Sequence, residues 1–216
     1  MFKLAISILF CFVTSMAQAC STALLLMIDV SNSIDEGEYR LQTDGLADAL
    51  LDPEIMDEII AGQVAMSVMQ WSGQDRQMIT QPWTILTNGD QVREFALIAR
   101  TTPRAFALSD TAPGNALSLA LDQMENAPDC HRKIIDVSGD GTANSGIDVR
   151  PLRTRAERMG VTVNGIAIEG MGLTITVYFH RSIITRDGFV ITARGHREYP
   201  DAIRRKILRE VARIFG

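Results

Sequence analysis

Apolar residues along the chain fall into short continuous runs, separated by longer stretches with the helical spacing of about 3.6 residues. The strongest run, Thr22–Asp29 (TALLLMID), is apolar at nearly every position, which is typical of a strand buried on both faces of a sheet. The runs predict strands at Thr22–Asp29, Gln63–Trp71, Arg76–Leu86, Lys133–Ser138, Val161–Ile168 and Gly188–Ala193. The helical spacing predicts helices at Ile34–Leu51, Asp90–Arg100, Pro113–Glu125, Val149–Met159 and Tyr199–Phe215.

Strands and helices alternate, which predicts an α/β fold: a doubly wound, mostly parallel central sheet with helices on both faces. The turn-like Gly73-Gln74-Asp75 joins the second and third strands, so these two are expected to form a hairpin. Pro82 places the third strand at an edge, because proline cannot donate to a central ladder. The stretch 170–186 has no clear period, and its structure is left open. In open sheets ligands bind beyond the carboxyl ends of the strands, so polar clusters there are the first candidates.

The first 19 residues, MFKLAISILFCFVTSMAQA, have the pattern of a secretory signal peptide. One positive charge precedes an apolar run, and Ala17-Gln18-Ala19 supplies a small-x-small cleavage pattern. This run is half the length of the ~20 residues that a membrane-spanning helix needs, and no other stretch is long and apolar enough. We therefore expect residues 1–19 to be removed, residues 20–216 to form one domain without a transmembrane segment, and the protein to be periplasmic or secreted. A buried N-terminal helix is the alternative.

Composition narrows the function classes. The chain of 216 residues is 46% hydrophobic and 22% charged, which fits a globular domain and excludes a disordered chain. Its net charge of −5 argues against nucleic-acid binding, which needs a basic surface. Three cysteines, with no Cys-x-x-Cys pair, exclude a disulfide-dense scaffold and give no sign of structural zinc. The sequence has no P-loop, dinucleotide-binding glycine turn or Gly-x-Ser-x-Gly elbow.

Three polar clusters lie where the carboxyl edge of the sheet is expected. Asp29, Ser31 and Ser33 form an Asp-x-Ser-x-Ser turn after the strongest strand, Thr111 lies in the loop before a helix, and Asp140 follows another buried strand. Each residue alone could cap a helix or close a turn. Together they form an all-oxygen set of two carboxylates and three hydroxyls, which suits Mg²⁺, with Mn²⁺ or Ca²⁺ as alternatives, rather than zinc or copper.

These clusters resemble the metal-ion-dependent adhesion site of the von Willebrand factor A domain family, and Asp29, Ser31, Ser33, Thr111 and Asp140 match its ligands. Within that family the chain is most similar to a group of exported bacterial proteins of unknown function. The resemblance covers essentially the whole chain after residue 19. Further matching stretches are Ile134–Gly141, Val163–Gly165 and Ala202–Lys206. The departures are Pro113, where many members have a second threonine, an additional carboxylate at Asp110, and a poorly matching segment at 171–186.

The resemblance implies a Rossmann-like von Willebrand factor A fold and an exported protein-binding module rather than an enzyme. The divalent cation would be completed by a Glu or Asp of a protein partner, because neutral hydroxyls leave the ion under-neutralised. One alternative is a Mg²⁺-dependent hydrolase in which Asp29 or Asp140 acts as nucleophile or base. Another is a metal-stabilised structural or assembly subunit. The sequence identifies neither the partner nor the oligomeric state.

The resemblance also implies a disulfide. In the resembled fold the strands that begin after Cys20 and Cys130 are parallel neighbours at the centre of the sheet, and each cysteine lies at a similar distance before its aspartate. A Cys20–Cys130 bridge is therefore expected, in keeping with an oxidising compartment. Two free thiols are one alternative. Lipid attachment at Cys20 is another, less favoured because Ala17 stands where a lipobox usually has leucine.

The histidines and the basic residues of the last helix are weaker candidates for a functional site. His131, His180 and His196 are scattered without ligand spacing and are predicted to lie at the surface or to be satisfied locally. The last helix carries four basic residues that are predicted to form a solvated face, with an anionic partner or membrane surface as the alternative. These residues are Arg204, Arg205, Lys206 and Arg209.

Overall fold

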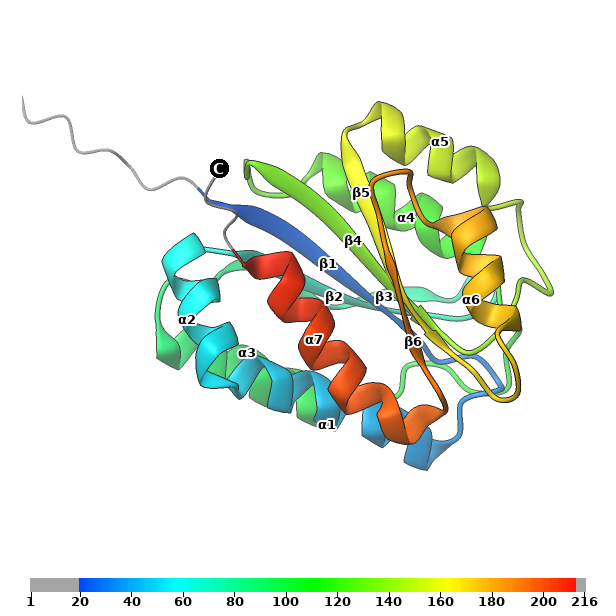
Figure 1. The fold of residues 1–216 in the computed structure, drawn as a ribbon, viewed down its shortest axis with the longest axis horizontal. Coiled ribbons are helices and arrows are strands. Elements are labelled where there is room, and N and C mark those ends of the chain that lie inside the picture. Colours follow the sequence, from blue (N-terminus) through cyan, green and yellow to red (C-terminus); the bar gives the residue numbers. More distant parts are fainter. Residues whose placement is uncertain (1–19, 213–216) are drawn as a thin grey trace, which may run out of the picture.

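The computed structural model describes residues 20–212, so the predicted signal peptide lies outside the described residues. A six-stranded sheet runs through the centre of the domain, with helices on both faces (Figure 1). In spatial order the strands are β3 (Gln77–Ile85), β2 (Ala65–Trp71), β1 (Thr22–Asp29), β4 (Arg132–Gly139), β5 (Val161–Ile168) and β6 (Val190–Ala193). Neighbouring strands are parallel except β2 and β3, which form the predicted hairpin and place β3 at the edge. The doubly wound, mostly parallel fold is confirmed.

Strand β1 divides the apolar core into two layers, because successive side chains of a strand point to opposite faces. Leu24 and Leu26 pack into one layer, and Leu25 and Met27 into the other. The first layer is covered by α1 (Glu36–Leu51), α2 (Pro53–Gly62), α3 (Gly89–Thr101) and α7 (Tyr199–Val211). The second is covered by α4 (Pro113–Glu125), α5 (Arg150–Arg158), α6 (Thr174–Tyr178) and the short π-helix η1 (Phe179–Ile183).

Helix α2 differs from the sequence prediction, and the stretch 170–186, left open by the sequence, has a defined structure. Helix α2 was not predicted, although Asp52 caps its first turn and Pro53 occupies its first position, a combination typical of a helix start. The open stretch 170–186 forms α6 and η1, which are too short to show a helical period. No helix in the described part of the chain is long and apolar enough to cross a membrane.

The predicted disulfide is present at the amino ends of the two central strands. Cys20 and Cys130 are bonded, with their Cα atoms 4.6 Å apart. Both cysteines are buried and pack against Ala23 and Ala65. The bridge lies at the edge of the sheet opposite to Asp29, because β1 begins beside Cys20 and ends at Asp29.

The prediction of a solvated basic face on the last helix is wrong at Lys206, which is completely buried. Its Nζ lies 2.7 Å from Oδ1 of Asp136 on β4 and 2.5 Å from Oε1 of Glu210. The same Glu210 oxygen accepts a hydrogen bond of 2.7 Å from Asn164 on β5. Burial raises the pKa of Asp136 to about 7, although Lys206 pulls it down. An ion-pair network, rather than apolar contact alone, therefore fixes α7 on the sheet.

Two other basic residues of this helix also make internal contacts. Arg204 pairs with Asp52 at 2.8 Å, and the guanidinium of Arg209 lies 3.7 Å from the centre of the Phe189 ring. Lys206, Arg204 and Arg209 thus attach the helix to its neighbours. Arg205, by contrast, is exposed and pairs with Asp201 of the same helix, as predicted for a solvated face.

Replacing Lys206 by methionine is expected to lower the free energy of unfolding by about 3 kcal/mol, because two buried carboxyl groups lose their cation. Urea unfolding measures the change, and the exposed Arg205→Met serves as the matched control on the same helix. A Lys206→Met protein as stable as the Arg205→Met protein would contradict a stabilising role for the network.

Candidate metal centre

The three predicted clusters meet at the carboxyl edge of the sheet, and hydrogen bonds from backbone and side-chain groups attach their loops to one another. The amide of Asn32 donates to the carbonyl of Ser109 at 2.9 Å, which joins the loop after β1 to the loop before α4. Thr111 and Asn144 exchange hydrogen bonds of 2.8 and 3.1 Å, which join that loop to the one after β4. Arg104 Nη2 donates to the carbonyls of two residues of the β1 loop, at 3.0 and 2.8 Å. The loops therefore hold the site as one unit.

The structure brings all five predicted residues together. Ser31 and Ser33 have their hydroxyl oxygens 3.1 Å apart, and Ser33 donates to Oδ1 of Asp140 at 2.5 Å. Two glycines, Gly139 and Gly141, lie against the side chains of this set. A Cβ atom added at Gly139 would lie 2.9 Å from Oδ2 of Asp29, and one added at Gly141 would lie 3.5 Å from the hydroxyl of Thr111. Glycine at 139 thus leaves room for the Asp29 carboxylate.

The Asp29 carboxylate is the most unusual group in the site. Its Oδ1 accepts a hydrogen bond of 2.8 Å from the backbone amide of Ser31, but its Oδ2 is buried and has no hydrogen-bond partner. Burial raises the pKa of Asp29 to about 7, against the hydrogen bonds from Ser31, which lower it. Burial also raises the pKa of Asp140, opposed by the hydrogen bond from Ser33. An unpartnered buried carboxylate oxygen is costly, and a cation would offset that cost.

The donor set fits a hard divalent cation. Two carboxylates and three hydroxyls offer oxygen only, in keeping with Mg²⁺ and Mn²⁺ preferences. No group of three or more histidine, cysteine or acidic side chains with the geometry of a metal site occurs within residues 20–212. A centre in this part of the chain would therefore depend on hydroxyl ligands as well as carboxylates. Asp29, Ser31, Ser33, Thr111 and Asp140 are the residues that would hold the ion.

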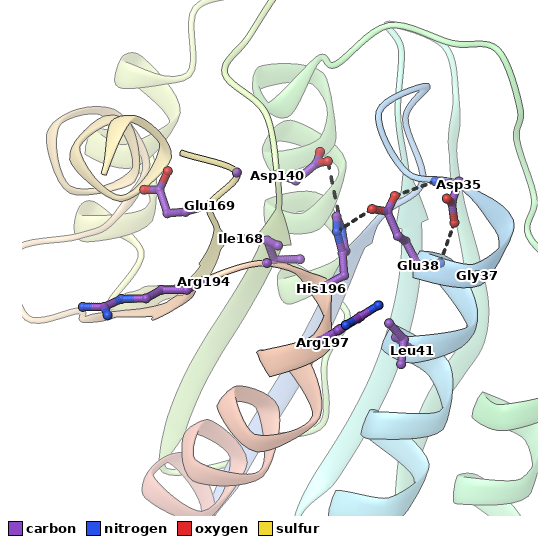
Figure 2. A pocket seen from close by; sticks show the side chains of 12 residues that line it. Asp35, Gly37, Glu38, Leu41, Asp140, Ile168, Glu169, Arg194, His196 and Arg197 are labelled. Carbon is purple, nitrogen blue, oxygen red and sulfur yellow. Dashed lines mark hydrogen bonds and ion pairs between the residues drawn. The ribbon is translucent and has the colours of Figure 1, made fainter. Parts of the chain in front are cut away.

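A cleft of about 670 Å³ adjoins the site and contains a histidine that the sequence did not assign to it (Figure 2). His196 Nδ1 lies 2.9 Å from Oε1 of Glu38, and its Nε2 points toward Oδ2 of Asp140 at 3.9 Å. Glu38 also accepts from the backbone amide of Asp35, within the capping box of α1. The prediction that His196 has only a surface or local role is thus incomplete. Its position after the carboxyl end of β6 is the signal that could have placed it here.

A second hollow, of about 460 Å³, also borders the site. It is lined by the ligand candidates Ser33 and Thr111, by Asn144, and by Leu108 and Asp110 of the loop before α4. Asp110, which departs from the pattern of the resembled family, therefore adds an exposed carboxylate to this hollow. Pro113, the other departure, occupies the first turn of α4.

Residues 19–215 match the family described as "Protein of unknown function (DUF1194)". The chain belongs to this family. No protein with a curated description matches the sequence significantly. Solved structures with the same fold include proximal thread matrix protein 1 from the mussel byssus, with 17% identity, a TM-score of 0.66, and coverage of 88% of this chain and 47% of that chain.

Two bacterial structures are similar to the same degree. A von Willebrand factor type A protein from Catenulispora acidiphila has 17% identity and a TM-score of 0.63, over 88% of this chain and 43% of that one. The pilus adhesin SpaC from Lactobacillus rhamnosus GG has 12% identity and a TM-score of 0.63, over 88% of this chain and 30% of that one. This chain thus spans less than half of these proteins. Its fold is that of the von Willebrand factor A domain.

Proposed function

We propose that this DUF1194 protein is an exported protein-binding module that depends on a divalent cation. Asp29, Ser31, Ser33, Thr111 and Asp140 hold the ion, and the buried, unpartnered Oδ2 of Asp29 is the observation that carries the assignment. The ion supplies positive charge at a surface that otherwise exposes hydroxyls and carboxylates. Mg²⁺ is the ion that this donor set fits best, with Mn²⁺ and Ca²⁺ as alternatives.

The chemistry of the site favours an acidic residue as the partner's contact. Two carboxylates balance the charge of a divalent ion, but the five proposed ligands, with one oxygen each, leave at least one of the six positions of an octahedral Mg²⁺ open. A hard cation favours a carboxylate oxygen at such a position. The cleft reaches Asp140, and the second hollow reaches Ser33 and Thr111, so a partner has access to the site. A glutamate or aspartate side chain of another protein can therefore complete the coordination shell.

The comparisons support this proposal in general terms. A structure of the mussel byssus protein is described with a zinc-occupied MIDAS motif, at 15% identity and a TM-score of 0.62 over 88% of this chain and 46% of that one. Others with this fold are described as a pilus adhesin and a minor pilin. The secretory pattern of residues 1–19 and the Cys20–Cys130 disulfide support export to the periplasm or beyond.

Metal binding is tested by thermal unfolding of the metal-free protein with and without added Mg²⁺. The melting temperature is expected to rise by about 5–10 °C when Mg²⁺ exceeds its Kd by about a hundredfold. Asp140→Ala should remove this rise, because it removes one of the two carboxylates. The matched control is Asp110→Ala, an exposed acid in the adjoining hollow that is not a proposed ligand. Equal responses of the two variants would contradict the assigned ligands.

A Mg²⁺-dependent hydrolase is the second candidate, and the Glu38–His196 pair beside Asp140 is the observation that favours it. A histidine oriented by a carboxylate next to a metal is an arrangement that hydrolases use for proton transfer. Incubation with p-nitrophenyl phosphate and Mg²⁺ or Mn²⁺ separates the candidates. If the protein releases phosphate and Asp29→Ala abolishes this activity, the proposal of a binding module is wrong and the hydrolase is favoured.

A further inference from the structure

Large apolar side chains are exposed on three loops around the proposed metal site. Leu108 is 88% exposed and lines the same hollow as the ligand candidates Ser33 and Thr111. Met171 is 95% exposed and follows Gly170, which lines the cleft with Asp140. Leu173 and Ile147 are about half exposed on the loops after β5 and β4. We call Leu108, Ile147, Met171 and Leu173 the apolar rim.

Leu108 has a backbone conformation that leucine disfavours. Its φ is +50°, in the left-handed region where glycine and asparagine are the common residues. Its side chain gains little from packing, because nearly all of it faces solvent. Neither the turn nor the core therefore explains a leucine at this position. Such an outlier beside a binding site motivates a functional explanation.

The other members of the rim are also placed outside the core. The loop that carries Ile147 is attached to the site, since Asn144 and Ser145 both donate to the carbonyl of Thr111. Large exposed apolar side chains gathered on the loops at one edge of a sheet are a feature of protein interaction surfaces. The loops that border the proposed metal site therefore carry apolar groups that a partner could remove from water.

We propose that the apolar rim selects a partner segment in which an acidic residue is flanked by apolar side chains. This inference rests on the proposed function, because the cation fixes the position of the partner's carboxylate. The open coordination position of the ion favours a carboxylate oxygen from the partner. The exposed leucine, isoleucine and methionine side chains favour apolar residues next to that acid. Leu108 is the principal contact, since it shares the hollow with two ligands.

The test uses three acetylated, amidated peptides with saturating Mg²⁺, and Kd values from NMR titration of the whole domain. The first, Gly-Leu-Asp-Leu-Gly, offers a carboxylate with apolar neighbours. The second, Gly-Ser-Asp-Ser-Gly, keeps the carboxylate alone, and the third, Gly-Leu-Asn-Leu-Gly, keeps the apolar neighbours alone. We expect the first to bind at least about fivefold more tightly than the second. The third should bind too weakly to measure.

Variants of Leu108 distinguish the effect of its apolar side chain from the effect of its backbone conformation. Leu108→Asn suits the left-handed conformation and removes the apolar group, so it should abolish the preference for leucine without lowering the melting temperature. Leu108→Met should retain the preference. The matched control is Leu97→Asn on α3, where the leucine is 59% exposed outside the site.

The outcomes distinguish the inference from the function on which it rests. Equal binding of the two aspartate peptides, or a preference that survives Leu108→Asn, would overturn the role of the rim and leave the metal-dependent module intact. Failure of both aspartate peptides to bind, or binding that persists with EDTA, would contradict the proposed function and the inference with it.

Discussion

Replacing Asp29 by asparagine is expected to weaken Mg²⁺ binding by roughly a hundredfold or more while the domain stays folded. Asparagine has the shape of aspartate, and its Oδ1 can still accept from the backbone amide of Ser31. The charge at the buried Oδ2 position is lost, and the amide nitrogen that replaces it cannot ligate a cation. Isothermal titration with Mg²⁺ measures the change.

The same substitution should stabilise the metal-free protein, in a pH-dependent way. Burial raises the pKa of Asp29 from 3.8 to about 7, so between these values the folded state keeps a proton that the unfolded state has lost. The stability of the wild type therefore falls as the pH rises from about 4 to about 7, and levels off above. Asparagine does not ionise, so the variant avoids this loss of unfolding free energy, which is at most about 4 kcal/mol.

Urea unfolding in EDTA at pH 4.5 and pH 8 tests this expectation. The two proteins should be similar in stability at the lower pH, and Asp29→Asn should be the more stable at the higher pH. Asp110→Asn, a change of the same type at an exposed carboxylate nearby, should show no such difference. An Asp29→Asn protein that is less stable than the wild type at pH 8, or that still binds Mg²⁺ normally, would refute the role assigned to this carboxylate.

The site could be anticipated from the sequence because its ligands lie next to strong strand signals. Strand β1 ends at Asp29, where the apolar run ends, and Asp140 follows the last residue of β4 directly. Parallel strands align their carboxyl ends, so residues far apart in the chain meet without any further information. The pairing of Cys20 with Cys130 required the order of strands from the resembled fold, because the cysteines themselves carry no pairing signal.

His196 and Lys206 show what a linear pattern misses. His196 contacts Glu38 because the turn His196–Glu198 and α7 pack beside α1, a long-range contact that the local sequence does not encode. Only its position after β6 places it at the carboxyl edge of the sheet. Lys206 lies on the buried stripe of α7 with Tyr199, Ile203 and Glu210, spaced three and four residues apart. An aspartate within the apolar strand β4 was a signal that a buried cation must lie nearby, because an unpaired charge is not tolerated there.

Removing the disulfide should have the largest effect on stability. The Cys20→Ala/Cys130→Ala protein is expected to lose about 4–5 kcal/mol of unfolding free energy, since the bridge closes a loop with a sequence separation of 110 residues. The cross-link restricts the unfolded chain, and both sulfur atoms lie in a small buried cluster at the amino end of the sheet. Urea unfolding of the two proteins under oxidising conditions measures the difference.

The wild type unfolded with excess dithiothreitol is the matched control, because reduction breaks the same bond without changing the sequence. It should match the double alanine variant to within about 1 kcal/mol, the difference reflecting the removed sulfur atoms. Mg²⁺ affinity of the folded variant should not change, because the bridge lies at the edge of the sheet opposite to Asp29. A loss of stability below about 1 kcal/mol would show that the unfolded chain gains little freedom when the bridge is removed. A parallel loss of Mg²⁺ affinity would show instead that the register of β1 and β4 depends on the bridge, since these two strands deliver both carboxylates to the site.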